Sequence, residues 1–262
     1  MPPHTKTLTP DLVDVLIIGG GPAGLTSDVS ITRNVHTAIR TAHFHMLPTW
    51  DGKSPIERMI TGIFEVTDEN GKVWKGRSLV LATGIIDVPL EIPGFDECWG
   101  RSIESSGILA INDVAPTPIA LHVSCNAARF TKFVTIYTNG DTSKKDDFQA
   151  AIGPTAPFAI DGRRITKFVL GPNQLGIMIH FEDGTTKDEA FLGHKPVSKL
   201  KSDFLVKQLG LEITPQGDIK TNPPFGETSL TGCFAAGDNS SFLKTTPNAV
   251  NSGANSAARV AT

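Results

Sequence analysis

Residues 13–24 read Val-Asp-Val-Leu-Ile-Ile-Gly-Gly-Gly-Pro-Ala-Gly, and this stretch decides the fold. The apolar run Val13–Ile18 is typical of a parallel strand that is buried on both faces. Pro22 suits the first turn of a helix, which we expect to run to about Thr32. Between strand and helix lie glycines in the spacing GxGxxG, namely Gly19, Gly21 and Gly24. A glycine-rich turn in this context predicts a βαβ unit that binds a nucleotide.

Each glycine of the turn has its own expected role. Gly19 permits the tight turn, Gly21 lets the backbone approach a pyrophosphate, and Gly24 lets the helix pack closely on the strand. The helix start then offers free N–H groups and the positive end of its dipole to phosphates. An acid about 20 residues further on should bind the ribose hydroxyls, but the strand Val35–Ile39 ends in Arg40. A mononucleotide, substitution through Arg40 and a damaged site all stay open.

Composition and charge narrow the class of protein. With 39% hydrophobic and 19% charged residues, the 262-residue chain is not disordered as a whole. The net charge of −3 gives no sign of a nucleic-acid partner. No apolar run approaches the ~20 residues of a membrane helix, and the first residues lack the apolar core of a signal peptide. The cysteines lie far apart, at Cys98, Cys125 and Cys233. We therefore expect no disulfide scaffold, no membrane association, and a reducing, cytoplasmic location.

Short aliphatic strands alternate with helical stretches along the whole chain, which predicts an α/β fold. A second βαβ unit is expected from strand Ile108–Ile111, helix Ile119–Phe130 and strand Phe133–Tyr137. Further expected strands are Ile63–Val66, Val73–Lys75, Ser78–Ala82, Lys167–Leu170, Gly176–Phe181 and Gly232–Ala236. We also expect a charged turn at 144–147 and a helix of small residues at 248–260. The fold class is therefore two Rossmann-like nucleotide-binding units, the second (103–229) inserted into the first (1–102 and 230–262).

Three segments, in their order and spacing, resemble two-domain flavoproteins of the thioredoxin reductase type, which are class II pyridine nucleotide-disulfide oxidoreductases. They are Gly19–Leu25, Ala82–Gly84 and Cys233–Asp238. Residues 45–51, 97–100, 106–110 and 134–138 resemble the fungal branch that includes the gliotoxin-type dithiol oxidases. The resemblance covers most of residues 11–262. It implies an FAD-dependent oxidoreductase, with a possible homodimer because the family usually forms dimers.

The resemblance also implies which residues bind FAD. Gly19, Gly21, Pro22, Ala23 and Gly24 would lie at the pyrophosphate, His45 beside the flavin, Ala82 and Gly84 near the adenine half, Asp238 at the ribitol, and Asn248 and Ala249 at the pyrimidine end of the isoalloxazine. The backbone N–H groups of the last two would face the ring where negative charge grows on reduction.

The family's defining CxxC dithiol is absent, because Trp99–Ile103 runs straight into Glu104–Gly107. Thiol–disulfide exchange needs an attacking and a resolving thiol. We therefore expect electrons to pass between flavin and a small molecule of fungal secondary metabolism, or to oxygen. By comparison with the family, segments are also missing after Ile39 and between Pro55 and Ile63. A remodelled enzyme and a faulty gene model both stay open.

The second unit is a poor match to a nicotinamide site, because the loop between Ile111 and Ile119 has no glycine. NAD(P)H use and transfer to oxygen both stay open. The alternative function is a flavin-poor scaffold with a binding or non-redox role. His43 and His45 could share a metal, but no third ligand cluster accompanies them, so no metal is expected. The sequence assigns no catalytic residue.

Overall fold

The computed structural model describes residues 12–31, 37–40, 62–68, 70–104, 117–129, 131–152 and 158–260. The chain forms two compact units, unit 1 from residues 1–86 and 199–262 and unit 2 from residues 87–198. The second unit is thus inserted into the first, but it begins at residue 87 where the sequence suggested 103, and it ends at 198 where the sequence suggested 229. The chain passes between the units in β5 (Ile85–Val88) and β13 (Val197–Leu200), which pair with each other.

Packing explains where the units divide. Residues between 90 and 99, including Phe95 and Cys98, pack in the core of unit 2 around Phe168. Residues between 205 and 230 pack instead in a core of unit 1, against Leu16 and Leu79. The bounds 103 and 229 expected from the sequence therefore do not mark the limits of the compact units.

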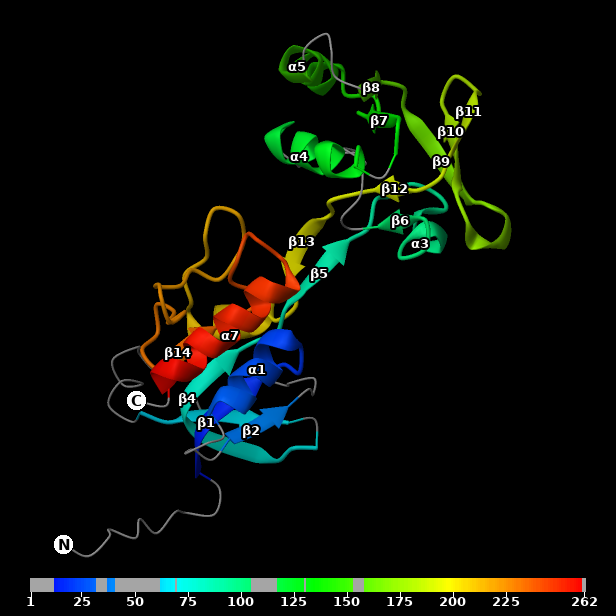
Figure 1. Cartoon of the computed structure of the whole chain (residues 1–262). Helices are drawn as coiled ribbons and strands as arrows, with labels where there is room; N and C mark the ends of the chain where they lie inside the picture. Colours follow the sequence, from blue (N-terminus) through cyan, green and yellow to red (C-terminus); the bar gives the residue numbers. More distant parts are fainter. Residues whose placement is uncertain are drawn as a thin grey trace, which may run out of the picture. The chain divides into compact units, whose positions relative to one another are not determined.

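Unit 1 is built on a five-stranded sheet in which the strands follow the path β14-β4-β1-β2, with β3 beside β4. The strands are β1 (Leu12–Ile18), β2 (Thr37–Arg40), β3 (Phe64–Thr67), β4 (Val73–Leu81) and β14 (Cys233–Ala235). All pairs along the path are parallel, and β3 is antiparallel to β4. Figure 1 shows this sheet with α1 (Pro22–Ile31) and α7 (Thr246–Val260) side by side on it.

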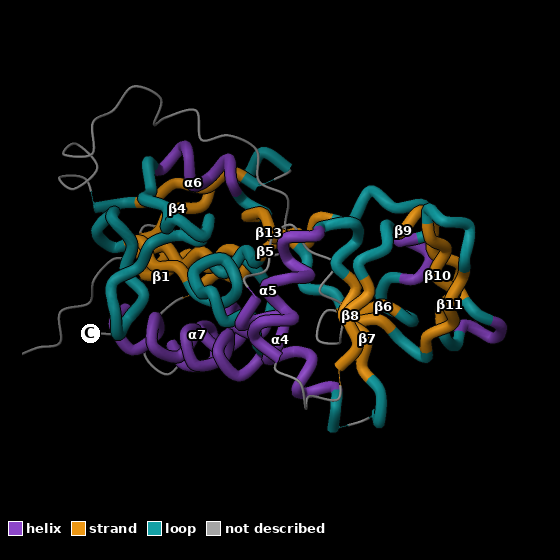
Figure 2. Tube along the Cα trace, turned by 90° about the horizontal axis from the view of Figure 1, so that it is seen from above, coloured by secondary structure: helices purple, strands orange, loops and turns teal. Residues whose placement is uncertain are grey.

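The two faces of the sheet bury different residues, because successive side chains of a strand point to opposite faces. Val15, Ile17 and Val80 are fully buried in the cluster that includes Ala23 of α1 and Ala249 of α7. Leu16 and Leu79 face the other side, in a cluster with α6 (Asp203–Leu209). Figure 2 shows α6 and α7 on opposite sides of β1 and β4. The continuous apolar run of β1 thus serves two cores, as expected.

One strand replaces two that the sequence suggested. Val73–Lys75 and Ser78–Ala82 belong to the single strand β4, which is unbroken through Gly76. A Cβ atom at Gly76 would lie 2.7 Å from Cγ of Leu16 on the neighbouring strand. The glycine therefore makes room for a core side chain, whereas in the sequence it looks like a break.

Unit 2 contains a parallel pair, an antiparallel three-stranded sheet β11-β10-β9, and a short pair β12-β6. The parallel pair β7 and β8 is joined through α5, as in a βαβ unit. The elements are α3 (Phe95–Cys98), β6 (Ile103–Glu104), α4 (Thr117–Ala127), β7 (Val134–Tyr137), α5 (Thr142–Ile152), β8 (Phe158–Asp161), β9 (Ile165–Leu170), a 3-10 turn (Pro172–Gln174), β10 (Ile177–Phe181), β11 (Thr186–Glu189) and β12 (Leu192–Gly193). The strand expected at 108–111 lies outside the described residues.

The charged segment 144–147 is helical, and the expected turn there is wrong. Asp141 begins the helix α5 because its Oδ1 accepts hydrogen bonds from the backbone N–H of Lys144 (3.0 Å) and from the Ser143 hydroxyl (2.8 Å). Phe148, one turn further on, is buried. Ile152, four residues further on, packs against Phe148, so the apolar contacts are confined to the second half of α5 and are too short a periodic signal to predict a helix through 144–147.

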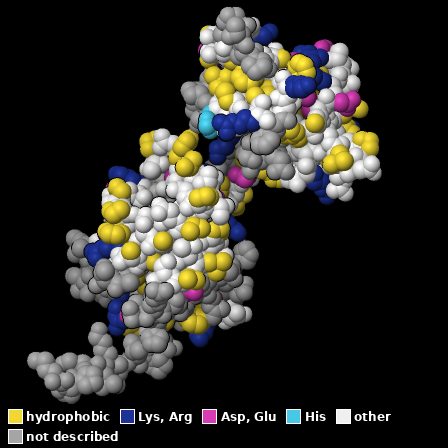
Figure 3. Space-filling model, viewed as in Figure 1, with side chains coloured by type: hydrophobic (Ala, Val, Ile, Leu, Met, Phe, Trp, Pro, Cys, Tyr) yellow, Lys and Arg dark blue, Asp and Glu magenta, His cyan; other side chains and the backbone are white. Residues whose placement is uncertain are grey.

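On the face shown in Figure 3, basic and acidic side chains lie interspersed among uncharged ones. Among the described helices, none has the length and apolar character that crossing a membrane would require.

Candidate functional site

The segments that the sequence singled out in unit 1 meet at one edge of its sheet. Because β1, β4 and β14 are parallel, their carboxyl ends lie together. The backbone N–H of Ala82 donates to the carbonyl of Ile18 (2.8 Å), and that of Ala236 donates to the carbonyl of Leu81 (3.0 Å). The glycine turn, the Ala82–Gly84 segment and the Gly237–Asp238 segment are therefore neighbours, although more than 200 residues separate the first from the last.

The glycine turn lies where the strand order reverses. β2 is on one side of β1 and β4 is on the other, and ligands of open α/β sheets bind at such a switch point. A Cβ at Gly19 would lie 2.1 Å from the carbonyl oxygen of Ala82, and a Cβ at Gly24 would lie 1.9 Å from the carbonyl oxygen of Gly19. Neither position has space for a side chain, so these two glycines let strand, turn and helix approach closely.

Gly21 has the opposite surroundings, because a Cβ placed there would meet no atom of the described residues within 4 Å. Its carbonyl accepts the first helical hydrogen bond, from the N–H of Leu25 (3.0 Å), so Gly21 is the N-cap of α1. The first-turn N–H groups of an α-helix, here those of Ala23 and Gly24, have no partner within the helix. The first turn of α1 contains no acidic residue. This open space beside free donors suits an anion.

The loop after β14 is fixed to the neighbouring strand by Asn239, a residue with no exposed surface. Its Nδ2 donates to the carbonyl of Leu81 (2.9 Å) and to Oγ1 of Thr83 (3.2 Å). The backbone N–H of Gly237 donates to Oγ of Ser252 on α7 (2.9 Å). These bonds hold the loops after β4 and β14 together, and nothing in the sequence pattern pointed to Asn239 for this role.

Asp238 is half-buried between these anchors. Nζ of Lys244 donates a hydrogen bond to the Asp238 carbonyl (2.8 Å) and forms a largely buried ion pair with Asp218 (2.8 Å). Lys244 thus ties the Asp238 loop to the segment around Asp218. No hydrogen bond from a described residue reaches the Asp238 carboxylate.

The N-terminus of α7 is less open than the sequence suggested. The N–H of Asn248 donates to Oγ1 of Thr245 (3.4 Å), and the N–H of Ala249 donates to the carbonyl of Thr245 (2.9 Å). The Asn248 side chain bonds the carbonyl of Leu243 (3.0 Å). A ligand at these N–H groups would have to compete with acceptors from the chain itself.

Helices α1 and α7 are in close contact directly behind the glycine turn. A Cβ at Gly253 would lie 2.3 Å from the carbonyl oxygen of Ala23. The buried hydroxyl of Ser27 lies 3.0 Å from the carbonyls of both Ala23 and Gly253, and so links the two helices. The small-residue composition of 248–260 was the sequence signal for this contact.

Of the other residues that the sequence assigned to the FAD site or its surroundings, Gly84 and Arg40 are described by the structure and His45 is not. Gly84 has a left-handed φ of 70°, and its carbonyl accepts the N–H of Lys201 (3.3 Å). Arg40 pairs in register with Ile18, at the carboxyl end of β2. This is the position at which the glycine motif predicts a ribose-binding acid. His45 lies outside the described residues, as does the loop at 112–116. Among the described residues no group of His, Cys, Asp and Glu could hold a metal ion.

The three cysteines do not form a dithiol. Cys98 and Cys233 are fully buried in separate cores, and Cys125 is exposed on α4. Burial raises the pKa of the Cys98 thiol and raises that of Cys233 to about 12. Thiolate is the form that exchanges disulfides, so neither buried thiol is suited to redox exchange near neutral pH.

Comparison with known proteins identifies the family. No protein-family model matches the chain. The chain is 36% identical to the thioredoxin reductase tcpT of Claviceps purpurea, over 94% of this chain and 92% of that protein. It is 34% identical to the thioredoxin reductase sirT of Leptosphaeria maculans, over 93% and 92%. The alignment with tcpT extends over 296 positions, more than the 262 residues of this chain, so the relative contains internal segments that this chain lacks.

Solved structures show the same fold. TrxB of Bacillus anthracis superposes with a TM-score of 0.72 at 20% identity, covering 95% of this chain and 97% of that one. A thioredoxin reductase from Giardia duodenalis superposes with a TM-score of 0.68 at 19% identity, with the same coverage. The sequence identity to the fungal proteins over almost the whole chain, together with this fold, shows that the chain belongs to the thioredoxin reductase family of FAD-dependent oxidoreductases.

Proposed function

We propose that unit 1 binds FAD at the carboxyl edge of its sheet, and that the protein oxidises or reduces a small molecule of fungal secondary metabolism without a dithiol relay. The observation that carries the proposal is the open space at Gly21, in contact with the first turn of α1 at the point where the strand order reverses. A pyrophosphate needs both close backbone approach and unpaired N–H donors.

The residues at this edge fit a dinucleotide. The N–H groups of Ala23 and Gly24 would hold the diphosphate, and Gly21 leaves room for its oxygens. Ala82 would lie along the adenine half. The Asp238 carboxylate would accept hydrogen bonds from ribitol hydroxyls, at a loop fixed by Asn239. Asn248 and Ala249 would face the ring through the first turn of α7.

FAD, when bound, supplies two-electron transfer to or from an organic substrate. The chain itself supplies binding and orientation, and it supplies no thiol pair. Since Cys98 and Cys233 are buried in different units, a protein disulfide cannot carry electrons to a second protein in the manner of a CxxC motif. The small molecule must therefore reach the coenzyme itself. NAD(P)H use by unit 2, a homodimer and a cytoplasmic location stay predictions.

A flavin-poor scaffold with a binding or non-redox role is the second candidate, and one observation favours it. Arg40 lies at the carboxyl end of β2, in register with Ile18, where an acid normally bonds the adenosine ribose. A guanidinium donates hydrogen bonds and cannot accept them from ribose hydroxyls. Loss of that bond would weaken FAD binding.

Reconstitution with FAD distinguishes the two candidates. Purified protein is incubated with FAD, freed of excess coenzyme and examined for the visible absorption of oxidised flavin. Stoichiometric bound flavin is expected, and colourless protein after incubation would overturn the proposal in favour of the scaffold.

A charge variant locates the site. Gly21→Asp places a carboxylate where the diphosphate would lie, and like charges in contact cost several kcal/mol, so FAD affinity should fall by at least about a hundredfold. Asp is also a good N-cap, so the apoprotein should stay as stable as wild type. Val29→Asp adds the same charge to α1 at a side chain that is 71% exposed, and should bind FAD normally. Equal affinity in both variants would place the coenzyme elsewhere.

A further inference from the structure

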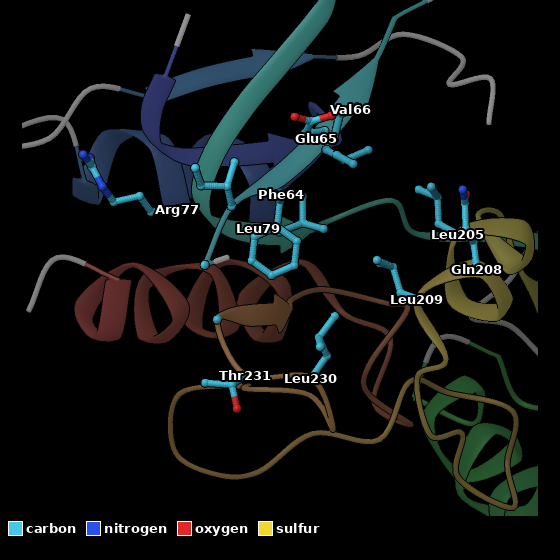
Figure 4. A pocket seen from close by; sticks show the side chains of 14 residues that line it. Phe64, Glu65, Val66, Arg77, Leu79, Leu205, Gln208, Leu209, Leu230 and Thr231 are labelled. Atoms are coloured by element: carbon cyan, nitrogen blue, oxygen red, sulfur yellow. The ribbon is translucent and has the colours of Figure 1, made fainter. Parts of the chain in front are cut away.

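A cavity lies in unit 1, apart from the glycine turn. It has a volume of about 200 Å³ and lies between the β3–β4 pair, helix α6 and the turn before β14. Figure 4 shows Phe64, Leu79, Leu209 and Leu230 converging on it from these four elements. The cavity is on the α6 face of the sheet, whereas α1 and the glycine turn pack on the other face.

The interior of the cavity is apolar. Val66, Leu79, Leu205, Leu209 and Leu230 each line it and are each no more than 8% exposed. An enclosed apolar cavity of about 150 Å³ stays free of water and binds benzene, and the present cavity, although it opens to solvent, offers water equally few hydrogen-bond partners along its apolar walls. A space of this size and lining therefore favours an apolar ring system over water or a polar metabolite.

The charged groups at the cavity already have partners. Glu65 pairs with Nζ of Lys75 (2.7 Å), and Arg77 pairs with Asp14. The other polar side chains that line it, Gln208 and Thr231, are neutral. A charged ligand would have to leave water without a free counter-ion in the lining, which is costly. A neutral ligand with one hydroxyl could bond Thr231.

The walls are fixed by hydrogen bonds. In the turn before β14, the N–H of Gly232 donates to Oε1 of Glu227 (3.0 Å), and the N–H of Leu79 donates to the carbonyl of Gly232 (2.9 Å). On the opposite wall, Oδ1 of Asp68 accepts the N–H of Lys72 (3.1 Å) across the β3–β4 turn. A preformed site loses little conformational entropy when a ligand enters.

From these observations we infer that the cavity between β3, β4 and α6 is a binding site for a small, neutral, aromatic molecule of one or two rings with one hydroxyl group. The site is distinct from the proposed FAD site, since it lies on the other face of the sheet and shares no residue with the glycine turn. Ile18, at the end of β1, lines the cavity and directly precedes Gly19.

Calorimetric titration with 2-naphthol tests the inference. Wild-type protein should bind one molecule per chain, and 2-naphthoate, which differs by a charged carboxylate, should bind at least about tenfold more weakly. Absence of 2-naphthol binding would overturn the site, and equal binding of the anion would overturn the choice of a neutral ligand. Titration with and without FAD should give the same affinity, whereas competition by FAD would show that the cavity is part of the coenzyme site.

Matched variants locate the binding. Leu209→Phe fills the cavity and should weaken 2-naphthol binding at least about tenfold. Leu200→Phe adds the same ring to a side chain that packs against the same core but does not line the cavity, and should leave affinity unchanged. If Leu209→Phe does not fold, Val66→Ile adds one methylene to the cavity and should weaken binding by a smaller factor. Unchanged affinity in every folded cavity variant would overturn the inference.

Discussion

The two faces of the unit 1 sheet are packed by opposite means. On the α1–α7 face the contacts involve small residues, and a single added carbon at Gly253 or Gly24 would lie within 2.3 Å of backbone oxygen. On the α6 face large aliphatic side chains surround a cavity of about 200 Å³. One sheet therefore combines a face with close backbone contacts at its glycines and a face with room for a ligand.

The difference shows where positional accuracy is needed. The α1–α7 face, called the tight face below, holds α1 at a fixed distance from β1 and β4, and the glycine turn depends on that distance. The α6 face is called the loose face. It borders the glycine turn only through Ile18, so we expect lost packing elsewhere on it to cost free energy with little effect on the turn.

The largest effect should come from Gly253→Val on the tight face. The new side chain would collide with the Ala23 backbone, which cannot move away as a flexible side chain could. We expect a loss of about 3 kcal/mol or more in the free energy of unfolding, measured by urea denaturation. Asn251→Val, an exposed position of the same helix, should change it by no more than about 0.5 kcal/mol. Similar losses in the two variants would contradict the difference between the faces.

A smaller loss in the free energy of unfolding is expected at alkaline pH, from ionisation of Cys233 on the loose face. The folded-state pKa of Cys233 is about 12, because burial disfavours the thiolate, against about 9 in an exposed thiol. The unfolded chain thus releases this proton first, and stability is lost as pH rises from 9 towards 12, by at most about 1.4 kcal/mol per pH unit. Urea denaturation at about pH 8 and pH 10 should show a loss that is smaller in Cys233→Ala. An identical loss in the variant would mean that Cys233 ionises freely in the folded protein.

The smallest effect should come from Leu209→Phe, since the added ring atoms enter existing space. The free energy of unfolding should change by less than about 1.5 kcal/mol in the same urea assay. A loss as large as that of Gly253→Val would show that the α6 face is packed as tightly as the other.

The first βαβ unit was predictable from the sequence to within one or two residues. The expected strand Val13–Ile18 is Leu12–Ile18, and the expected helix from Pro22 to Thr32 is Pro22–Ile31. A continuous apolar run, a glycine turn and a proline at N1 all point to the same local structure, so no distant contact was needed to choose it.

Contacts between distant segments were not predictable in this way. The glycine motif and Gly237–Asp238 were both singled out, but the buried Asn239 that ties β14 to β4 has no local signature, because its partners Leu81 and Thr83 are 158 and 156 residues away. Helix α6 was missed as well. A helix of seven residues is too short to show a clear periodic pattern in the sequence. It is stabilised by the packing of Leu205 and Leu209 against the sheet.

The insertion of unit 2 has a consequence for biosynthesis. A ribosome produces β1, α1 and β4 long before β14 and α7, because all of unit 2 lies between them. Until those last elements emerge, the nascent chain exposes Val80 and the surface of α1 that Gly253 later covers. The carboxyl edge of the sheet is thus completed only after unit 2 has been synthesised, and until then the apolar surface of β4 and α1 is open to aggregation.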